Sequence, residues 1–202
     1  MRAFSLSLVA LSLLAACSGE LPKLVGLFVP PAEAQPVEMA MRWDHVEGSE
    51  AWTEATLAAL HGHGAALLTT VPADIEDWCP GYAAQDAVGR SAFWAGLIST
   101  LAKHESTWNP RAVGGGGRWF GLVQIAPSTA RYRHCEAKSG AALKEGVANL
   151  SCAVRIMAVT VPRDGVVSRG MRGVAADWGP FHSARKREDM RAWIRAQSYC
   201  AP

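Results

Sequence analysis

The sequence lacks the features that mark several common functional classes. Its 202 residues carry a formal net charge of only +2, and the basic triplet Arg185-Lys186-Arg187 is typical of a solvated helix start rather than a nucleic-acid-binding face. No Cys-x-x-Cys pair is present, so the cysteine spacings do not match a zinc site. The glycine run 114–117 is not followed by Gly-Lys-Ser/Thr, which argues against a phosphate-binding loop. We therefore expect no nucleic-acid partner, no metal and no cofactor.

The N-terminal residues have the pattern of a secretory leader. Arg2 supplies a positive charge, and residues 4–16 form an apolar run that is too short to span a bilayer. Residues 14–17, Leu-Ala-Ala-Cys, then resemble a bacterial lipobox, which predicts cleavage before Cys17 and acylation of its thiol. Several acyl chains at one site hold a protein stably at a membrane. The alternative is an ordinary signal peptide with a cleavage site at residues 32–34.

The remaining cysteines form an even set, which supports export. They are Cys79, Cys135, Cys152 and Cys200, and in an oxidising periplasm they can form two bridges with three possible connectivities. We expect Cys135–Cys152, which closes a local loop and contributes roughly 3 kcal/mol through chain entropy. We also expect Cys79–Cys200, which ties the C-terminus to the start of the domain. The predicted location is the periplasm, lipid-anchored to the cell envelope, with the outer membrane favoured.

One carboxylate lies at the end of an apolar helical pattern. Phe93, Leu97, Leu101 and Glu105 are each four residues apart, so they share one face of a helix. A helix buries its apolar face, so Glu105 should lie at the edge of the core with a raised pKa. A carboxylic acid that stays protonated near neutral pH suits the general acid for a glycosidic bond. The alternative is a solvated Glu at the end of a surface helix, which Asn109-Pro110 should terminate.

The residues around this carboxylate resemble a known enzyme family. The resemblance rests on Glu105-Ser106, Asn109-Pro110, the block Gly121-Leu122-Val123-Gln124-Ile125, and Pro127 with Thr129-Ala130. Together they are similar to the catalytic core of the soluble-lytic-transglycosylase (SLT) enzymes of peptidoglycan, with a good match over about residues 91–130. The resemblance implies a mainly α-helical, lysozyme-like fold (goose-type lysozyme or SLT domain) with little β structure.

The resemblance also implies an activity. The enzyme would cleave the β-1,4 bond between N-acetylmuramic acid and N-acetylglucosamine and leave a 1,6-anhydro sugar, with Glu105 acting first as acid and then as base. Its partners would be peptidoglycan glycan strands, and a membrane through the lipid anchor; the sequence indicates no protein partner. Two other functions stay open: a hydrolytic, lysozyme-type muramidase, and a non-catalytic peptidoglycan-binding lipoprotein. A structural role within a cell-envelope machine is a further alternative.

Several residues are candidates for holding the glycan. The resemblance places Ser106, Gly121 and Leu122 in the substrate groove. Gln124 is expected to hydrogen-bond a sugar N-acetyl or hydroxyl group, although a glutamine there also fits a role in satisfying backbone groups of a tight turn. Three aromatic side chains flank the site and fit either stacking on sugar rings or a place in the core: Trp108, Trp119 and Phe120.

One segment departs from the family pattern. Where the family has a Tyr-Asn pair whose Tyr positions the acid, this chain has Asp177-Trp178 and is one residue shorter. We expect Asp177 to assist Glu105 or a sugar hydroxyl, and Trp178 to form a wall of the groove. In the muramidase alternative, Asp177 would hold a water molecule. A third possibility is that Asp177 only caps the turn before Gly179-Pro180.

The chain is predicted to have three parts. Residues 1–16 are the signal peptide, residues 17–71 a lipid-anchored tether and N-terminal arm, and residues 72–202 the catalytic domain. Within the arm, residues 50–60 have a helical pattern opened by Ser49. The arm is expected to pack on the domain, the alternative being an exposed aromatic face that meets glycan.

Downstream of the arm, the sequence predicts a loop and two further helices. The loop carries Asp74, Glu76 and Asp77, which are expected to form a solvated acidic turn. The helices are expected at about residues 143–161, stopped by Pro162 and Gly165, and at about residues 183–197.

Overall fold

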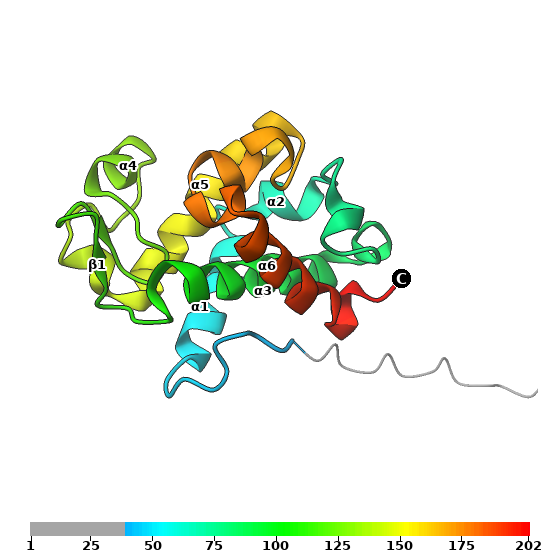
Figure 1. The fold of residues 1–202 in the computed structure, drawn as a ribbon, viewed down its shortest axis with the longest axis horizontal. Helices are drawn as coiled ribbons and strands as arrows, with labels where there is room; N and C mark the ends of the chain where they lie inside the picture. The colour runs from blue at the N-terminus through cyan, green and yellow to red at the C-terminus, as the bar shows by residue number, and fades with distance from the viewer. Residues whose placement is uncertain (1–38) are drawn as a thin grey trace, which may run out of the picture. The chain divides into compact units, whose positions relative to one another are not determined.

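The computed structural model describes residues 39–202, which lie in a compact unit of residues 36–202. The predicted leader and Cys17 fall outside the described residues. Within the described range, helices dominate (Figure 1), as expected. The α-helices are α1 (Glu50–His61), α2 (Ala65–Thr69), α3 (Ala87–Ser106), α4 (Pro127–Tyr132), α5 (Gly146–Asp164) and α6 (Ala184–Arg195). Short 3-10 helices occupy Ile75–Asp77, Tyr82–Ala84, Ala142–Lys144, Arg169–Met171, Gly173–Ala176, Gly179–His182 and Ser198–Cys200.

Helix α3 is the central element. The sequence predicted one apolar face, but every side chain from Ser91 to Ala102 is buried, because α1, α2 and α6 all pack against the helix. Its first turn is capped by Asp86, whose carboxylate accepts a hydrogen bond from the Gly89 amide at 2.9 Å. A helix that is apolar on all sides belongs in the interior of a domain. The helices that surround α3 therefore fix the position of its C-terminal end.

Helix α3 ends at Ser106, before the predicted stop signal Asn109-Pro110. Thr107 and Trp108 have positive φ angles of 52° and 56°, so the chain leaves the helix directly after Ser106 rather than at Asn109-Pro110. The Trp108 indole N–H donates to the Ser99 carbonyl at 3.0 Å, which turns the chain back onto its own helix. The backbone amides of Thr107 and Trp108 also donate to the Lys103 and Ala102 carbonyls at 3.1 and 3.3 Å, so the helix end is capped before the proline is reached.

The predicted arm is part of the same core. Helix α1 confirms the expected helix, although the Ser49 side chain makes no capping hydrogen bond. Trp43, Leu60 and Leu67 are fully buried and belong to the same hydrophobic cluster as α3 and α5. The structure thus packs residues 41–68 on the rest of the domain and leaves Trp43 no exposure to a glycan.

A small antiparallel sheet follows α3. Strand β1 (Val113–Gly114) pairs with β2 (Trp119–Phe120), with Val113 opposite Phe120 and Gly114 opposite Trp119. The glycines at 115–117 all have positive φ, which explains the glycine run between the strands. A bridge between Phe120 and Ile125 then closes the Gly121–Ile125 block into a compact loop. The hairpin and α4 lie together at one end of the molecule (Figure 1).

Helix α5 packs against α1 and α2. The sequence places an apolar stripe on one face of this helix: Val147, Leu150, Val154, Met157 and Val161. All of its members are buried except Val147, which is 48 % exposed. The prediction that Pro162 would stop the helix is wrong. Pro162 lies in the last turn, where the loss of one backbone hydrogen bond is tolerated, and α5 ends at Gly165 with φ 68°.

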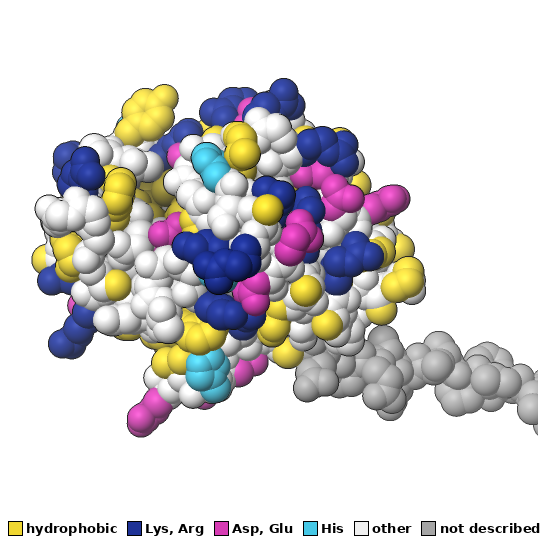
Figure 2. Space-filling model, in the orientation of Figure 1, with side chains coloured by type: hydrophobic (Ala, Val, Ile, Leu, Met, Phe, Trp, Pro, Cys, Tyr) yellow, Lys and Arg dark blue, Asp and Glu magenta, His cyan; other side chains and the backbone are white. Residues whose placement is uncertain are grey.

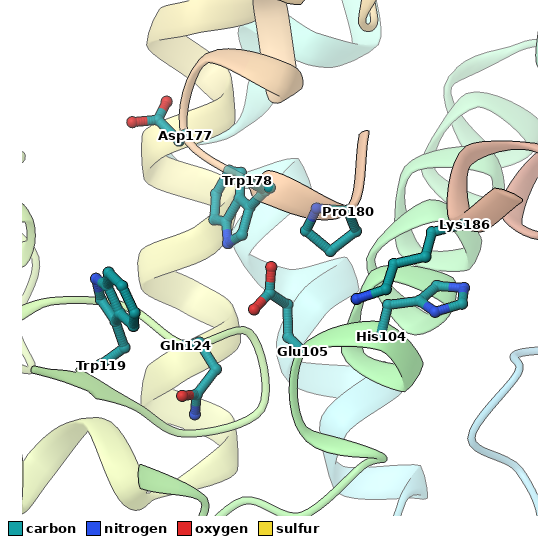
Figure 3. A pocket seen from close by; sticks show the side chains of 9 residues that line it. His104, Glu105, Trp119, Gln124, Asp177, Trp178, Pro180 and Lys186 are labelled. Atoms are coloured by element: carbon teal, nitrogen blue, oxygen red, sulfur yellow. The ribbon is translucent and has the colours of Figure 1, made fainter. Parts of the chain in front are cut away.

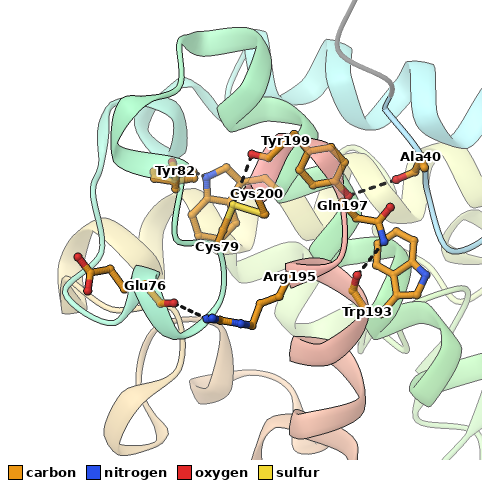
Figure 4. Close-up of a disulfide and its surroundings, with 10 residues drawn as sticks. Ala40, Glu76, Cys79, Tyr82, Trp193, Arg195, Gln197, Tyr199 and Cys200 are labelled. Carbon is orange, nitrogen blue, oxygen red and sulfur yellow. Dashed lines mark hydrogen bonds between the residues drawn. A yellow bond between two sulfur atoms is a disulfide. The ribbon is translucent and has the colours of Figure 1, made fainter. Parts of the chain in front are cut away.

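Both predicted disulfides are confirmed. Cys135 is bonded to Cys152, and Cys79 to Cys200, which joins positions 121 residues apart. Figure 4 shows the second bridge beside Tyr199, whose hydroxyl donates to the Ala40 carbonyl at 3.2 Å. The first and last described segments of the chain are therefore fastened to each other.

The acidic loop is not a solvated turn at Asp74. This residue is 1 % exposed, and its carboxylate accepts hydrogen bonds from the backbone amides of Val167, Ser168 and Arg169 at 2.6–2.9 Å. A carboxylate that receives three amide hydrogens is buried without an unsatisfied charge, so Asp74 organises the loop after α5. Among residues 39–202, no helix combines the length and the apolar character that crossing a membrane requires.

Candidate active site

A cavity of about 400 Å³ lies beside the C-terminal end of α3. Figure 3 shows Glu105 in its middle, with its carboxylate between Trp178 and Pro180 on one side and Lys186 on the other. The lining residues come from distant parts of the sequence: His104, Glu105, Trp119, Gln124, Asp177, Trp178, Gly179, Pro180 and Lys186.

The environment of Glu105 is that of a general acid. The residue is half-buried, as the helical pattern predicted, and burial raises the pKa of its carboxyl to about 7, against the opposing effect of the Lys186 cation. Within the described residues the carboxyl has no hydrogen-bond or ion-pair partner. With a pKa of about 7, the carboxyl keeps its proton below neutral pH and is free to face a ligand.

One side of the cavity is fixed by hydrogen bonds between neutral groups; we call residues 119–125 together with Trp178 the neutral wall. The fully buried Asn149 side chain holds this wall at two points and ties it to Leu143, all at 3.0 Å: its oxygen accepts from the Val123 amide, and its nitrogen donates to the Phe120 and Leu143 carbonyls. A buried amide with three partners has little freedom, so it fixes the loop.

Gln124 and Trp178 complete this wall. The Gln124 amide nitrogen donates to the Ala112 and Gly121 carbonyls at 3.2 and 2.9 Å, as the tight-turn alternative predicted. Its oxygen accepts no hydrogen bond within the described chain, and the residue lines the cavity, so the side chain can also accept from a ligand. Trp178 is 4 % exposed and donates from its indole nitrogen to the Val123 carbonyl at 2.8 Å.

The other residues of the family motif lie behind the cavity rather than in its lining. Leu122 is fully buried in the core. Gly121 has φ 84°, and a Cβ atom there would come within 2.1 Å of the Leu143 carbonyl oxygen, so only glycine fits. The Ser106 hydroxyl donates to the Ala102 carbonyl of its own helix at 3.2 Å. These three residues shape the loop and the helix end that present Gln124 and Glu105.

Asp177 lies at the edge of the cavity, and Figure 3 shows its carboxylate pointing away from Glu105. The residue is exposed, although partial desolvation raises the pKa of its carboxyl. Its side chain makes no hydrogen bond within the described chain, so it caps no turn there. Asp177 also borders a second hollow with Tyr132 and Arg133, on the far side from Glu105.

The opposite side of the cavity is built from charged groups; we call Lys103, His104, Lys186 and Asp189 the charged wall. The Asp189 carboxylate on α6 makes hydrogen bonds with two side chains of α3, His104 at 2.7 Å and Lys103 at 3.2 Å. It also receives a two-point contact from Arg42 at 2.7 and 3.0 Å. The Arg42, His104 and Lys103 hydrogen bonds hold the pKa of Asp189 well below its usual range. Burial lowers the pKa of His104, against the effect of the Asp189 carboxylate.

Comparison with known proteins identifies the segment that contains Glu105. Residues 83–164 match the family model of the transglycosylase SLT domain. Two glutamate-to-glutamine mutants of Bd0314 DslA are similar in structure, each with a TM-score of 0.74, 26 % sequence identity, and coverage of 83 % of this chain and 100 % of that chain. The wild-type DslA structure, form 2, is similar in fold, with a TM-score of 0.69, 24 % identity and the same coverage. No curated protein matches the sequence significantly.

The SLT match confirms the predicted fold class, a mainly helical, lysozyme-like fold. It spans α3, the hairpin, α4 and α5, and therefore includes Glu105 and all of the neutral wall except Trp178. Segments beyond the SLT match supply Trp178, Pro180 and Lys186, which enclose the acid from its other sides.

The sequence interpretation missed four lining residues: His104, Gly179, Pro180 and Lys186. For Lys186 a signal was present. It lies four residues before Met190 and eight before Ile194, two fully buried residues of α6, so it shares their helix face. The triplet Arg185-Lys186-Arg187 is thus only partly solvated, because its central member turns towards the domain.

The flanking aromatic residues divide between two roles. Trp119 is 43 % exposed and lines the cavity, and the Arg118 guanidinium lies over its ring at 5.0 Å from the centroid. Trp108 and Phe120 are partly buried and pack against the core. Within residues 39–202, no group of three His, Cys, Asp or Glu side chains is arranged to hold a metal ion.

Proposed function

We propose that this protein is a peptidoglycan lytic transglycosylase in which Glu105 is both acid and base. The SLT match and the similarity to DslA support a lytic-transglycosylase-type function on peptidoglycan. The observation that carries the proposal is the environment of Glu105: a half-buried carboxyl with a pKa of about 7, which points into a cavity with no protein partner. The proposed substrate bond is the β-1,4 link between N-acetylmuramic acid and N-acetylglucosamine.

In the first step, protonated Glu105 donates its proton to the glycosidic oxygen. The bond from this oxygen to C1 of muramic acid breaks, and the N-acetylglucosamine part leaves with a free 4-hydroxyl group. Burial favours this step, because a carboxyl desolvated in a cavity holds its proton near neutral pH. Gln124 and Trp119 are placed to hold the sugars on the neutral wall.

In the second step, the Glu105 carboxylate takes the proton of the muramic acid 6-hydroxyl. The 6-oxygen then bonds to C1 of its own ring, which gives the 1,6-anhydro product and returns the proton to Glu105. Since the nucleophile belongs to the substrate, a second protein carboxylate is unnecessary, whereas most glycosidases need two. The orientation of Asp177 away from Glu105 supports this route over the muramidase alternative.

The test is digestion of purified peptidoglycan by the wild type and by Glu105→Gln, with the products identified by mass spectrometry. The proposal predicts muropeptides with 1,6-anhydro ends from the wild type and none from the variant. Muropeptides with reducing ends would contradict the proposal and show that the protein hydrolyses the bond. Retained binding to intact sacculi with no product from either protein would favour the non-catalytic alternative.

We also propose that the protein is held in the periplasm by acylation of Cys17, most simply at the outer membrane. This proposal rests on the leader pattern of the sequence. Incorporation of labelled fatty acid into the wild type and its loss in Cys17→Ser would support it. Labelling that is equal in both proteins would contradict it.

A further inference from the structure

We propose that Lys186 forms an anion-binding site at one end of the cleft. Its ammonium group would bind a carboxylate carried on the lactyl side chain of muramic acid. This inference rests on the proposed function, because it assigns a further part of the same substrate to the same cavity. It makes Lys186 a specificity-determining residue that separates muramic-acid-containing glycan from neutral glycan.

The first support is that the Lys186 ammonium group has no hydrogen-bond or ion-pair partner in the part of the chain that the structure describes. The neighbouring carboxylate on its own helix is Asp189, three residues further on and normally within reach. That carboxylate is already occupied by Arg42, Lys103 and His104 at 2.7–3.2 Å. Lys186 is thus left as an uncompensated cation in the cavity lining.

The second support is the place of the ammonium group. Lys186 is half-buried, and Figure 3 shows its side chain reaching from α6 to a position between Glu105 and His104. The adjacent Arg185 is exposed and does not line the cavity. Lys186 therefore faces the acid and whatever sugar lies on it, whereas Arg185 faces solvent.

The third support is the protonation state of Glu105. When Glu105 binds substrate as the neutral acid, it supplies no counter-charge to Lys186, and the cavity end has a net positive charge. Asp177 does not supply one either, because its carboxylate points away from the cavity centre. An anionic group of the ligand is the remaining partner for the cation, and ammonium–carboxylate contacts are among the stronger hydrogen bonds.

The chemistry of the substrate limits which group this can be. The sugar rings of peptidoglycan carry hydroxyl and acetamido groups, which are neutral. A carboxylate enters through the lactyl ether of muramic acid, either as the lactyl carboxylate itself or as a carboxylate of the peptide attached to it. Both sources place the negative charge on the muramic acid, the sugar whose C1–oxygen bond is broken.

The test measures binding without turnover in the Glu105→Gln background. Trp119 and Trp178 line the cavity, so their fluorescence reports the bound ligand. Three ligands of equal length are compared: peptide-bearing glycan, glycan freed of its peptides by an amidase, and a neutral chito-oligosaccharide. The substitution is Lys186→Met, with Lys186→Arg as the charge-conserving variant and Arg185→Met as the matched control.

Loss of one charge-assisted contact should weaken binding of a carboxylate-bearing glycan about tenfold or more. Neutral oligosaccharide should bind both proteins equally, and Lys186→Arg should retain most of the affinity. A selective loss on amidase-treated glycan assigns the contact to the lactyl carboxylate, and a selective loss on peptide-bearing glycan assigns it to the peptide.

Equal effects on all three ligands, or an equal effect of Arg185→Met, would overturn the inference. The outcome is independent of the proposed chemistry. If the wild type releases anhydro-muropeptides but Lys186→Met binds all ligands normally, the function stands and the anion site fails. If no cleavage occurs but binding depends on Lys186 as described, the site stands and the enzymatic function fails.

Discussion

The two walls of the cleft meet at Glu105 but are held in different ways. The neutral wall is fixed by Asn149, which is fully buried and bonded to three backbone groups. The charged wall is fixed by Asp189, whose side chain is 35 % exposed and which joins α6 to α3 and to Arg42. Hydrogen bonds between buried neutral groups depend little on salt or pH, whereas partly exposed ion pairs are weakened by both.

This difference separates two tasks within one site. The neutral wall gives the glycan a fixed surface, because its geometry persists under all conditions in which the protein is folded. The charged wall sets the charge that the acid and its ligand experience, and this charge changes with pH and ionic strength. The following predictions test the separation, from the largest effect to the smallest.

The largest effect is expected where the walls meet. Glu105→Gln removes the proton donor and keeps the shape, so peptidoglycan cleavage should fall by about two to four orders of magnitude. The midpoint of unfolding should change little, because the amide replaces a carboxyl that is already neutral below pH 7. Muropeptide release and thermal unfolding measure the two quantities. Activity within tenfold of the wild type would remove Glu105 from the proposed role.

Asn149→Ala should remove the hydrogen bonds that hold the neutral wall in place. The substitution leaves the Val123 amide and the Phe120 and Leu143 carbonyls without their partner, which should cost about 2–3 kcal/mol in the free energy of unfolding. Urea unfolding measures this loss, and it should be equal at low and high salt. The matched control is Asn109→Ala, which loses a single exposed hydrogen bond from the Arg111 amide and should cost about 1 kcal/mol or less.

The charged wall should lose less stability in Asp189→Asn. Because the pairs are partly exposed, the expected cost at neutral pH is about 1 kcal/mol, and it should shrink at high salt. The folded-state pKa of Asp189 lies below its ordinary value, so its contribution is present above the unfolded pKa and is lost as the pH falls towards the folded pKa. The two proteins should therefore converge in acid. A difference that grows in acid would contradict this assignment.

The smallest effect is expected on the pH profile of Lys186→Met. The Lys186 cation lowers the pKa of Glu105, so its removal should raise that pKa. The wild type should lose activity as the pH rises through about 7, where Glu105 loses its proton, and the variant should lose it at a slightly higher pH. Rates of peptidoglycan cleavage from pH 5 to 9 measure the shift. A downward shift would show that Lys186 does not act on the acid.

The sequence predicted the part of the site that local patterns determine. The four-residue spacing of Phe93, Leu97, Leu101 and Glu105 was enough to place the acid at the end of a buried helix. The Gly121–Ile125 block was found by its resemblance to the SLT motif. The cysteine count limited the disulfides to three connectivities, of which the expected one is correct. These features depend on neighbours in the chain or on a small set of combinations.

The remaining features depend on contacts between distant residues, which periodicity does not contain. The sequence predicted a solvated side chain for Asp74, because the three backbone amides that donate to its carboxylate lie more than ninety residues away. The contact from the Trp108 indole to the Ser99 carbonyl at the end of α3 joins residues nine positions apart and was not predicted. Lys186 is an intermediate case. The sequence was enough to predict which face of its helix it shares, but not how α6 is oriented against α3.

The two sides of the cleft are synthesised at different times, because the charged wall includes residues of α6, which follows α3 and the hairpin in the chain. Glu105 and the neutral wall residues 119–125 come earlier in the chain than Lys186 and Asp189, which lie on α6. A chain that emerges from its N-terminus thus acquires its acid long before the second side of the cleft. Premature termination leaves a product with the acid but without an enclosed site. The cavity around Glu105 is thereby complete only when α6 has docked on α3.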